Sequence, residues 1–316
     1  MGDLFDDKNL KPMLIGAESE PFDSEDCIFE LKLDGERCIA FLDRSGTELR
    51  NKRNVKMLLK VPELSEIHKF VKNKCILDGE LVIIKNGVPV FSEIQARSLM
   101  SNKFKIELES KKSPATFVAY DILYYKNKQT TDLTLVERKK ILQKVVKEEN
   151  ERFAISRIIE EKGIALYNIA KQKNLEGIVA KKKDSKYYFD KRTKDWIKIK
   201  YLKDDDFVIC GYIIKSPSIT SLVLGQYQGD ELIYKGHVSM GISKLDFKTI
   251  SSQQQITKSP FHEYPVDKGS NNEVIWIKPE LVCTVAYMEK TETGGMRQPV
   301  YRGLRKDKIA KECFIV

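Results

Sequence analysis

The chain has 316 residues, of which 41% are apolar and 32% charged, so it is long enough for two domains and too apolar for large-scale disorder. Its net charge of +9 favours a polyanionic partner. The acidic start MGDLFDDK lacks an apolar signal core, and no run of about 18 apolar residues predicts a membrane span. We therefore expect a soluble, cytoplasmic protein rather than a secreted or membrane protein.

The cysteines are spaced without any CxxC pair, so no zinc or redox motif is visible. In a cytoplasmic protein such residues are typically reduced and buried. We predict free, buried thiols at Cys27, Cys38, Cys75, Cys210, Cys283 and Cys313.

The first third of the chain is rich in strand-like runs. "CILDGELVII" (75–84) and "TFVAYDILYY" (116–125) combine β-branched and aromatic residues, which favour strands. Between them, residues 101–115 are polar and charged, which predicts a loop or a short helix. Further along, "LEGIVAKKK" (175–183) and "DWIKIKYLK" (195–203) are also typical of strands.

Three segments predict helices. Residues 61–73 carry apolar side chains at helical spacing, and His68 is expected on or near the packing face as a structural residue. Residues 134–150 open with the capping-box sequence TLVE and continue with an apolar stripe. A further helix is predicted from about 164 to 173.

The pattern changes after "KDDD" (203–206). Short strands separated by Gly and polar turns follow, which indicates a small β-barrel. We predict two domains, 1–203 and 204–316. The first would be α+β, with antiparallel sheets and flanking helices, and the second all-β.

Residues 30–40, "ELKLDGERCIA", pose the main functional question. An Asp-Gly pair between alternating residues is a hairpin signal, and Lys32 would then be a surface charge beside a turn. Alternatively, Lys32 is a nucleophile held between leucines. The stretch by itself does not decide between the two.

Three other strands supply groups that suit an anionic ligand. "LDGEL" (77–81) presents Glu80 after a tight Asp-Gly, and "EGIVAKK" begins with Glu176. In "WIKIK", alternation places Lys198 and Lys200 on one side of a strand, with isoleucines on the other. Each strand alone is more often half-buried with a solvated face. Together, and in this order, they are specific.

In this order the motifs resemble the ATP-dependent DNA ligases, within the covalent nucleotidyltransferase superfamily. Residues 32–35 fit the nucleotidyl-lysine motif KxDG, and "LDGEL", "AYDIL", "LEGIV" and "WIKIK" are similar to the next motifs. "YRGLRKDK" (301–308) is similar to the final ligase motif RxDK. The likeness is greatest to the ligase module of bacterial ligase D and its stand-alone relatives. It implies a nucleotidyltransferase (adenylation) domain followed by an OB-fold domain.

The resemblance implies roles for the residues around the lysine motif. Lys32 would be the nucleophile that receives AMP from ATP. Glu30 would lie in the adenine pocket, and Leu33 and Asp34 would belong to the nucleotide-binding motif. Arg37 would contact phosphate or ribose. A lysine attacks as its neutral amine, which desolvation and nearby cations favour.

The later motifs imply the rest of the nucleotide site. Glu80 would bind ribose or take part in metal binding, and Glu176 would help hold Mg²⁺ or Mn²⁺. Tyr120 would stack on adenine. Lys198 and Lys200 would neutralise the α-phosphate as charge builds during transfer.

The final motif implies a role for the second domain, and the sequence departs from the family pattern in two places. Arg305 and Asp307 would come from the second domain to orient the pyrophosphate leaving group, which requires that domain to rotate. Either Lys52 or Arg53 would fill the basic position that follows the lysine motif. Because Lys32 lies so near the start, we expect no N-terminal DNA-binding domain.

Residues 181–203 contain ten basic and three acidic residues, a net charge of +7, interleaved with aromatic residues. Cations for phosphates and flat rings for bases are typical of nucleic-acid binding, although a solubilising charged loop has a similar composition. The DNA-binding residues predicted here are Lys181, Lys182, Lys186, Tyr187, Lys191 and Arg192.

The resemblance implies a monomer that seals nicked duplex DNA in repair or end joining, with a Ku-type end-binding protein as a partner. Two alternatives remain at this point. One is an RNA ligase or a capping-type nucleotidyltransferase, which share KxDG. The other is a non-catalytic nucleic-acid-binding protein.

Overall fold

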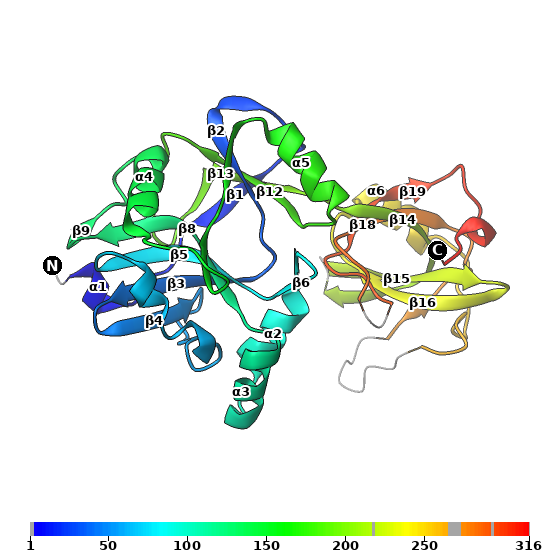
Figure 1. Cartoon of the computed structure of the whole chain (residues 1–316). Helices are drawn as coiled ribbons and strands as arrows, with labels where there is room; N and C mark the ends of the chain where they lie inside the picture. The colour runs from blue at the N-terminus through cyan, green and yellow to red at the C-terminus, as the bar shows by residue number, and fades with distance from the viewer. Residues whose placement is uncertain (1–2, 217–218, 265–272, 292–293, 316) are drawn as a thin grey trace. The chain divides into compact units, whose positions relative to one another are not determined.

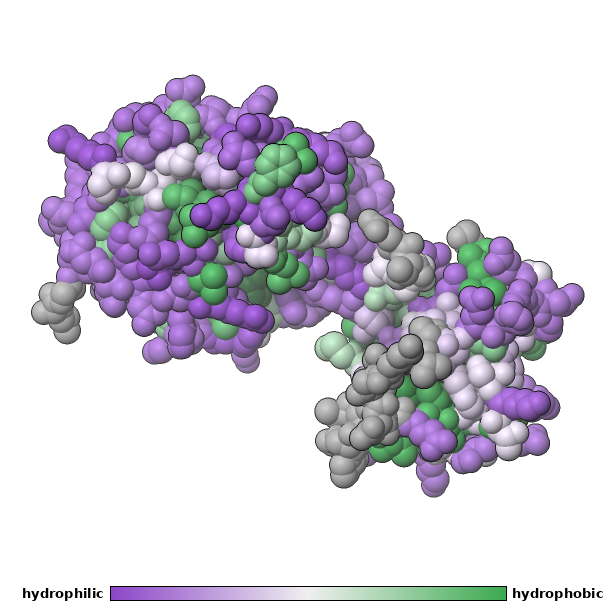
Figure 2. Space-filling view, turned by 90° about the horizontal axis from the view of Figure 1, so that it is seen from below, coloured by the Kyte–Doolittle hydropathy of each residue, from purple (hydrophilic) through white to green (hydrophobic). Residues whose placement is uncertain are grey.

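The computed structural model describes residues 3–216, 219–264, 273–291 and 294–315. The chain forms two compact units, Met1–Tyr201 and Leu202–Val316. The division falls two residues before the expected boundary, and the first strand of the second unit already begins at Lys203. No helix in the described ranges is long and apolar enough to cross a membrane. On the face seen in Figure 2, hydrophilic residues predominate on the first unit, whereas the coloured surface of the second unit is mixed.

The first unit contains two large sheets and one small hairpin (Figure 1). One has the strand order β1-β13-β12-β2-β11, in which only β1 and β13 pair in parallel. Its strands, taken along the chain, are β1 (Leu14–Glu18), β2 (Ser24–Leu31), β11 (Ile158–Glu161), β12 (Gly177–Lys182) and β13 (Arg192–Lys200).

The other sheet has the order β10-β8-β5-β3-β4, with β9 pairing to β8. Its strands are β3 (Glu36–Asp43), β4 (Gly46–Asn51), β5 (Cys75–Val82), β8 (Thr116–Tyr125), β9 (Lys128–Gln129) and β10 (Phe153–Ile155). β8 is an interior strand and is buried over most of its length, as its nearly continuous apolar sequence requires. A small separate hairpin joins β6 (Ile84–Lys85) and β7 (Val88–Pro89).

Helices cover the outer faces of the two sheets. α5 (Gly163–Gln172) contacts β12 and β2, and α4 (Leu135–Val145) contacts β8. The predicted capping box of α4 is present, since Thr134 and Glu137 satisfy each other's backbone N–H groups. Figure 1 shows the remaining helices of this unit: α1 (Leu4–Asp7), α2 (Phe91–Leu99) and α3 (Lys103–Lys112).

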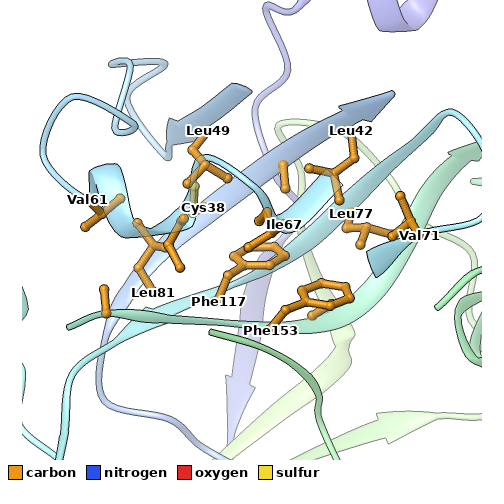
Figure 3. Close-up of a cluster of buried hydrophobic side chains, with 14 of the residues drawn as sticks. Cys38, Leu42, Leu49, Val61, Ile67, Val71, Leu77, Leu81, Phe117 and Phe153 are labelled. Atoms are coloured by element: carbon orange, nitrogen blue, oxygen red, sulfur yellow. The ribbon is translucent and has the colours of Figure 1, made fainter. Parts of the chain in front are cut away.

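Three apolar clusters hold the first unit together. One lies between the sheets and includes Ile39, Phe41, Val179 and Trp196. A second lies on the helical side of the β3–β5–β8 sheet and is drawn in Figure 3. The third, around Phe29, packs α5 against the other sheet. The sheets are therefore buried on both faces, which fixes the strands that carry the motif residues.

The helix predicted for residues 61–73 is two 3₁₀ turns instead, η1 (Pro62–Leu64) and η2 (Ile67–Phe70). The reason lies partly in Glu63, whose carboxylate binds the buried Arg97 side chain and a backbone N–H of a neighbouring loop. The ring Nδ1 of His68 lies 3.2 Å from Thr47 Oγ1, in keeping with a structural role. The other two predicted helices are confirmed by α4 and α5, and the loop-or-helix segment contains α3.

The Asp34-Gly35 hairpin prediction is wrong. β2 pairs with β11 and β12, whereas β3 pairs with β4 and β5, so residues 32–35 cross from one sheet to the other. Asp78-Gly79 makes no turn either, because both residues lie inside β5. In each pair the glycine serves close packing. A Cβ at Gly35 would lie 2.3 Å from Leu81 O, and one at Gly79 would lie 2.5 Å from Val118 O.

The second unit is a β structure with the strand order β16-β15-β14-β18-β19, and β17 pairs with β14. Its strands are β14 (Lys203–Ser216), β15 (Ile219–Gln228), β16 (Glu231–Val238), β17 (Ile275–Trp276), β18 (Val282–Tyr287) and β19 (Val300–Arg305). Apolar clusters lie on both faces of this sheet. It also contains α6 (Lys244–Ser251) and the 3₁₀ turn η3 (Ala310–Glu312), which the sequence patterns did not predict.

All six cysteines are free and buried, as predicted. Burial raises the pKa of the Cys38, Cys75 and Cys210 thiols, so these side chains behave as small apolar residues. Cysteine therefore contributes to packing in both units.

Candidate active site

Lys32 lies where the chain leaves β2 and crosses toward β3. Its backbone N–H donates to Gly177 O at 2.9 Å, and its Nζ lies 2.7 Å from Glu176 Oε1. The Glu176 side chain is only 5% exposed, so the ion pair is largely shielded from solvent. Gly177 has φ +136° and would place a Cβ 2.1 Å from Ile199 O, so only glycine fits beside the pair. Leu33 and Asp34 follow in the same crossing segment.

Two carboxyl groups from different sheets share the neighbourhood of Lys32. Burial raises the pKa of Glu80 to about 8; Arg37 and Lys32 oppose this shift, and Asp78 and Glu176 add to it. Burial also raises the pKa of Glu176, against the opposing effect of Lys32. Mutually repelling, partly desolvated carboxylates are groups that a divalent cation stabilises.

Glu80 and Glu176 would bind Mg²⁺ only if water and substrate phosphates supplied the remaining donor oxygens. Among residues 3–216, 219–264, 273–291 and 294–315, no cluster of three or more His, Cys, Asp or Glu side chains could hold a metal. Mg²⁺ typically takes one or two protein carboxylates and completes its shell with water and substrate phosphates. Glu80 and Glu176 match that donor set.

β13 presents two lysines to the same region. Ile199 is buried while Lys198 and Lys200 are half-buried, which confirms the predicted alternation of that strand. Lys198 Nζ lies 2.8 Å from Glu18 Oε2. Burial lowers the pKa of Lys200, and the nearby Lys198 and Lys32 lower it further. The strand therefore gathers positive charge beside Lys32, as an anionic ligand requires.

Arg37 is bound by the carboxylate of Asp78, a residue that the sequence did not predict as part of the site. Its Nε donates to Asp78 Oδ1 at 2.9 Å, and its Nη2 donates to the second oxygen. The guanidinium carbon lies 5.3 Å from the centre of the Tyr120 ring and 5.5 Å from that of Trp196. The sequence did contain a signal that Asp78 belongs to the site. Asp78 lies two residues before Glu80 in an apolar strand, where a buried carboxylate needs a partner.

Glu30 is buried beneath the site rather than open to it. Its carboxylate is ion-paired with Lys139 and, at 3.2 Å, with Lys181. Burial alone would raise the pKa of Glu30, but the two ammonium groups lower it. Lys181 Nζ lies 4.5 Å from the centre of the Tyr120 ring, so this cluster supports the ring proposed to stack on adenine. Lys139, on α4, was not predicted as part of the site.

Two of the predicted DNA-binding residues need correction. Lys181 and Tyr187 are each 3% exposed, because Lys181 points inward from β12 to Glu30 and the Tyr187 hydroxyl bonds to Asp78. Burial lowers the pKa of Lys181 to about 8. Neither side chain is exposed for contact with a DNA duplex.

The remaining predicted DNA-binding residues are exposed. Lys182 lies 3.6 Å from Asp195, and Arg192 Nη1 donates to Ile15 O. Lys186 and Lys191 also lie at the surface. The basic segment is thus split between an inward-facing part and an outward-facing part.

The structure does not choose between Lys52 and Arg53. Both are exposed in the turn that follows β4, which is shaped by Asn51 Oδ1 accepting from the Arg53 and Val55 backbone N–H groups. Asn51 also donates to Glu36 Oε1 at 2.8 Å, which ties this turn to the start of β3. Among the described residues, neither cation forms an ion pair with the carboxylates around Lys32.

Arg305 and Asp307 belong to the second unit. Arg305 makes two hydrogen bonds of 2.8 Å to Asp307, and its Nη1 lies 3.1 Å from Asp206 Oδ2. Lys308 Nζ lies 2.9 Å from the same oxygen. Asp206 and Lys308 were not predicted as site residues. The group forms a compact set of alternating charges at the end of β19.

Comparisons with known proteins agree with the motif order. Residues 13–200 match the family described as "ATP dependent DNA ligase domain", and residues 215–308 match the "ATP dependent DNA ligase C terminal region".

Two curated relatives are similar over most of the chain. One is the multifunctional non-homologous end joining protein LigD of Pseudomonas aeruginosa, 30% identical over 90% of this chain and 34% of the relative. The other is the SPbeta prophage-derived DNA ligase-like protein LigB of Bacillus subtilis, 29% identical over 94% of this chain and 99% of the relative. The chain thus spans about a third of the LigD relative.

Two solved structures are similar in fold over nearly the whole chain. The mycobacterial DNA ligase D complexed with ATP and MES has a TM-score of 0.56 at 26% identity and covers 97% of this chain and 98% of its own. The ligase domain of Mycobacterium tuberculosis LigD has a TM-score of 0.56 at 25% identity, with 98% and 99% covered.

Proposed function

The chain belongs to the ATP-dependent DNA ligase family, and we propose that it seals nicks with 5′-phosphate and 3′-hydroxyl ends through AMP carried on Lys32. The similarity to the mycobacterial ligase domains confirms the expected fold class, a nucleotidyltransferase domain followed by an OB-fold domain. The observation that carries the proposal is the convergence of Lys32, Glu176, Glu80 and Lys200 from separate strands.

Lysine adenylylation is the first step. Lys32 Nζ attacks the α-phosphorus of ATP, the N–P bond forms, and pyrophosphate leaves with the electrons of the broken P–O bond. Lys198 and Lys200 neutralise the charge that builds on the α-phosphate oxygens. A divalent cation, Mg²⁺ or Mn²⁺, held by Glu176 and Glu80 would supply charge neutralisation at the phosphates. Before the neutral amine can attack, Lys32 must lose a proton to solvent and its ion pair with Glu176 must break.

Nucleotide binding uses the aromatic and acidic groups around the same strands. Tyr120 offers a ring face to adenine, supported from beneath by Lys181 and Glu30. Arg37 contacts phosphate or ribose. Arg305 and Asp307 orient the pyrophosphate leaving group from the second unit.

AMP then passes from Lys32 to the 5′-phosphate of the nick, and the 3′-hydroxyl displaces it. Lys182, Lys186, Lys191 and Arg192 contact the backbone of the duplex, which is supported by their exposure on a basic segment. Affinity for nicked duplex should therefore fall steeply between low and moderate salt. A flat salt dependence would contradict this surface.

The biological setting follows from the named relatives. The LigD proteins of P. aeruginosa and the mycobacteria are described as non-homologous end joining proteins, and LigB of B. subtilis as prophage-derived. We therefore propose a role in DNA repair or end joining in a prokaryotic or phage-infected cytoplasm, as a monomer at the nucleoid, with a Ku-type end-binding partner.

Covalent labelling tests the central claim. The protein is incubated with α-labelled ATP and Mg²⁺ and then denatured. We expect protein-bound label that is lost in Lys32→Ala and retained in the matched control Lys194→Ala, an exposed lysine on β13. Absence of label with both Mg²⁺ and Mn²⁺ would overturn the ligase proposal. Sealing of nicked DNA against nicked RNA–DNA hybrids, and ATP against GTP, then tests the RNA ligase and capping alternatives.

A further inference from the structure

Tyr187 has a buried position that its sequence context did not predict. It lies in the segment between β12 and β13, yet it is 3% exposed. Its hydroxyl donates to Asp78 Oδ2 at 2.7 Å and accepts from the Met13 backbone N–H at 3.0 Å. Its own backbone N–H donates to Thr131 O at 2.9 Å. The residue is thus fixed by three separate segments of the first unit, two of which bind its hydroxyl.

Asp78 is the residue that accepts the hydrogen bond from this phenol. Its side chain has no solvent exposure, and it accepts from Arg37 Nε, from Arg37 Nη2 and from the Tyr187 hydroxyl. A buried carboxylate without donors is costly, so each of these three bonds offsets part of the cost of burying Asp78. Burial and the Asp78 carboxylate raise the pKa of Tyr187, which keeps its hydroxyl a donor at neutral pH.

Tyr187 also supports the aromatic wall behind Arg37. Its ring packs edge to face on Trp196, with centroids 6.1 Å apart and planes at 76°. Trp196 in turn lies 5.5 Å from the Arg37 guanidinium, and Tyr120 lies 5.3 Å from it. Asp78 therefore holds one edge of the guanidinium, and the rings flank it.

The remaining edge of this guanidinium, at Nη1, lies away from Asp78. Nη1 of Arg37 meets no hydrogen-bond acceptor among the residues that the structure describes, and the side chain is 15% exposed. A guanidinium fixed along one edge presents the remaining N–H groups in a defined direction, which suits a phosphate or ribose oxygen.

We propose that Tyr187 is a positioning residue for nucleotide binding, which fixes the direction of Arg37 through Asp78 and Trp196 and by accepting from Arg37 Nη2 at 3.4 Å. The inference rests on the proposed function, because the ligand of Arg37 is the nucleotide. It gives Tyr187 a role in lysine adenylylation instead of DNA contact.

Tyr187→Phe removes the hydroxyl and keeps the ring. We expect the second-order rate constant for ATP in single-turnover lysyl–AMP formation, measured without DNA, to fall about tenfold, which corresponds to about 1.4 kcal/mol. The loss should lie mainly in the half-saturating ATP concentration rather than in the maximal rate constant, because Arg37 would be misdirected rather than absent. The matched control is Tyr188→Phe, the same change at an exposed neighbouring tyrosine, which should leave lysyl–AMP formation unchanged.

A double-mutant cycle with Arg37→Lys distinguishes positioning from a general structural role. If Tyr187 acts through Arg37, Tyr187→Phe should cost less than about twofold once the guanidinium is gone. An equal loss in both backgrounds would overturn the inference, as would Tyr187→Phe behaving like Tyr188→Phe. If Tyr187→Phe fails to fold, Asp78→Asn in the same cycle tests the link between Tyr187 and Arg37, and an equal loss in both backgrounds would again overturn the inference.

The cycle also separates this inference from the proposed function. If the wild-type protein forms no lysyl–AMP, the proposed function fails and the inference fails with it. If the wild type labels on Lys32 and Tyr187→Phe is unimpaired, only the inference fails.

Discussion

Glu80 makes the stability of the first unit depend on pH. The pKa of this carboxyl is about 8 in the folded chain, against 4.5 for an unperturbed glutamate. Between these values the folded protein keeps a proton that the unfolded chain has lost. Stability should therefore fall as pH rises from about 4.5 to about 8, which is the reverse of the usual behaviour of a salt-bridged carboxylate.

The size of the effect follows from the shift in pKa. At 1.36 kcal/mol per pKa unit, the full shift corresponds to roughly 5 kcal/mol as an upper limit. Glu80 is half-buried, so solvent screening reduces this value, and we expect about 2 kcal/mol. Glu80→Gln cannot titrate and should remove that part of the pH dependence.

Urea denaturation at pH 5 and pH 8.5 measures the effect. The chain has two tryptophans, Trp196 in the first unit and Trp276 in the second, so a Trp276→Phe background makes fluorescence report the first unit alone. Glu80→Gln should gain about 2 kcal/mol over its parent between the two pH values. Glu25→Gln, at an exposed carboxylate, is the matched control. Parallel behaviour of the parent and Glu80→Gln would refute the reasoning.

Three further perturbations test the fold and the second unit. Arg138→Met should lower the unfolding free energy by about 3–5 kcal/mol, since Arg138 and Asp121 are both fully buried, 2.8 Å apart, and the carboxylate would lose its cation; an unchanged urea midpoint would contradict this. Gly163→Ala should cost about 1–3 kcal/mol, seen as a lower Tm, because its Cβ would lie 2.2 Å from Phe22 O. Arg305→Ala should slow lysyl–AMP formation about tenfold or more while sealing of a pre-adenylylated nick changes little; equal losses in both assays would rule out a role confined to the first step.

The sequence by itself determined the strands that carry the motifs, the α4 and α5 helices and the order of the motifs. These depend on local patterns. β8 is nearly continuously apolar because both its faces are buried, α4 begins at a capping box, and Lys198 and Lys200 alternate with isoleucines. Such patterns report which face of an element is buried, whatever it packs against.

Only the tertiary structure decided how those elements meet. The Asp34-Gly35 pair has the composition of a hairpin, but its flanking strands find partners in two different sheets, so it carries the chain between them. Residues 181–203 have the composition of a charged surface, but Lys181 is drawn inward by Glu30. Tyr187 is drawn inward by Asp78, where its hydroxyl finds an acceptor. Pairing between strands and burial of one charge against another are long-range properties, and a sequence window does not contain them.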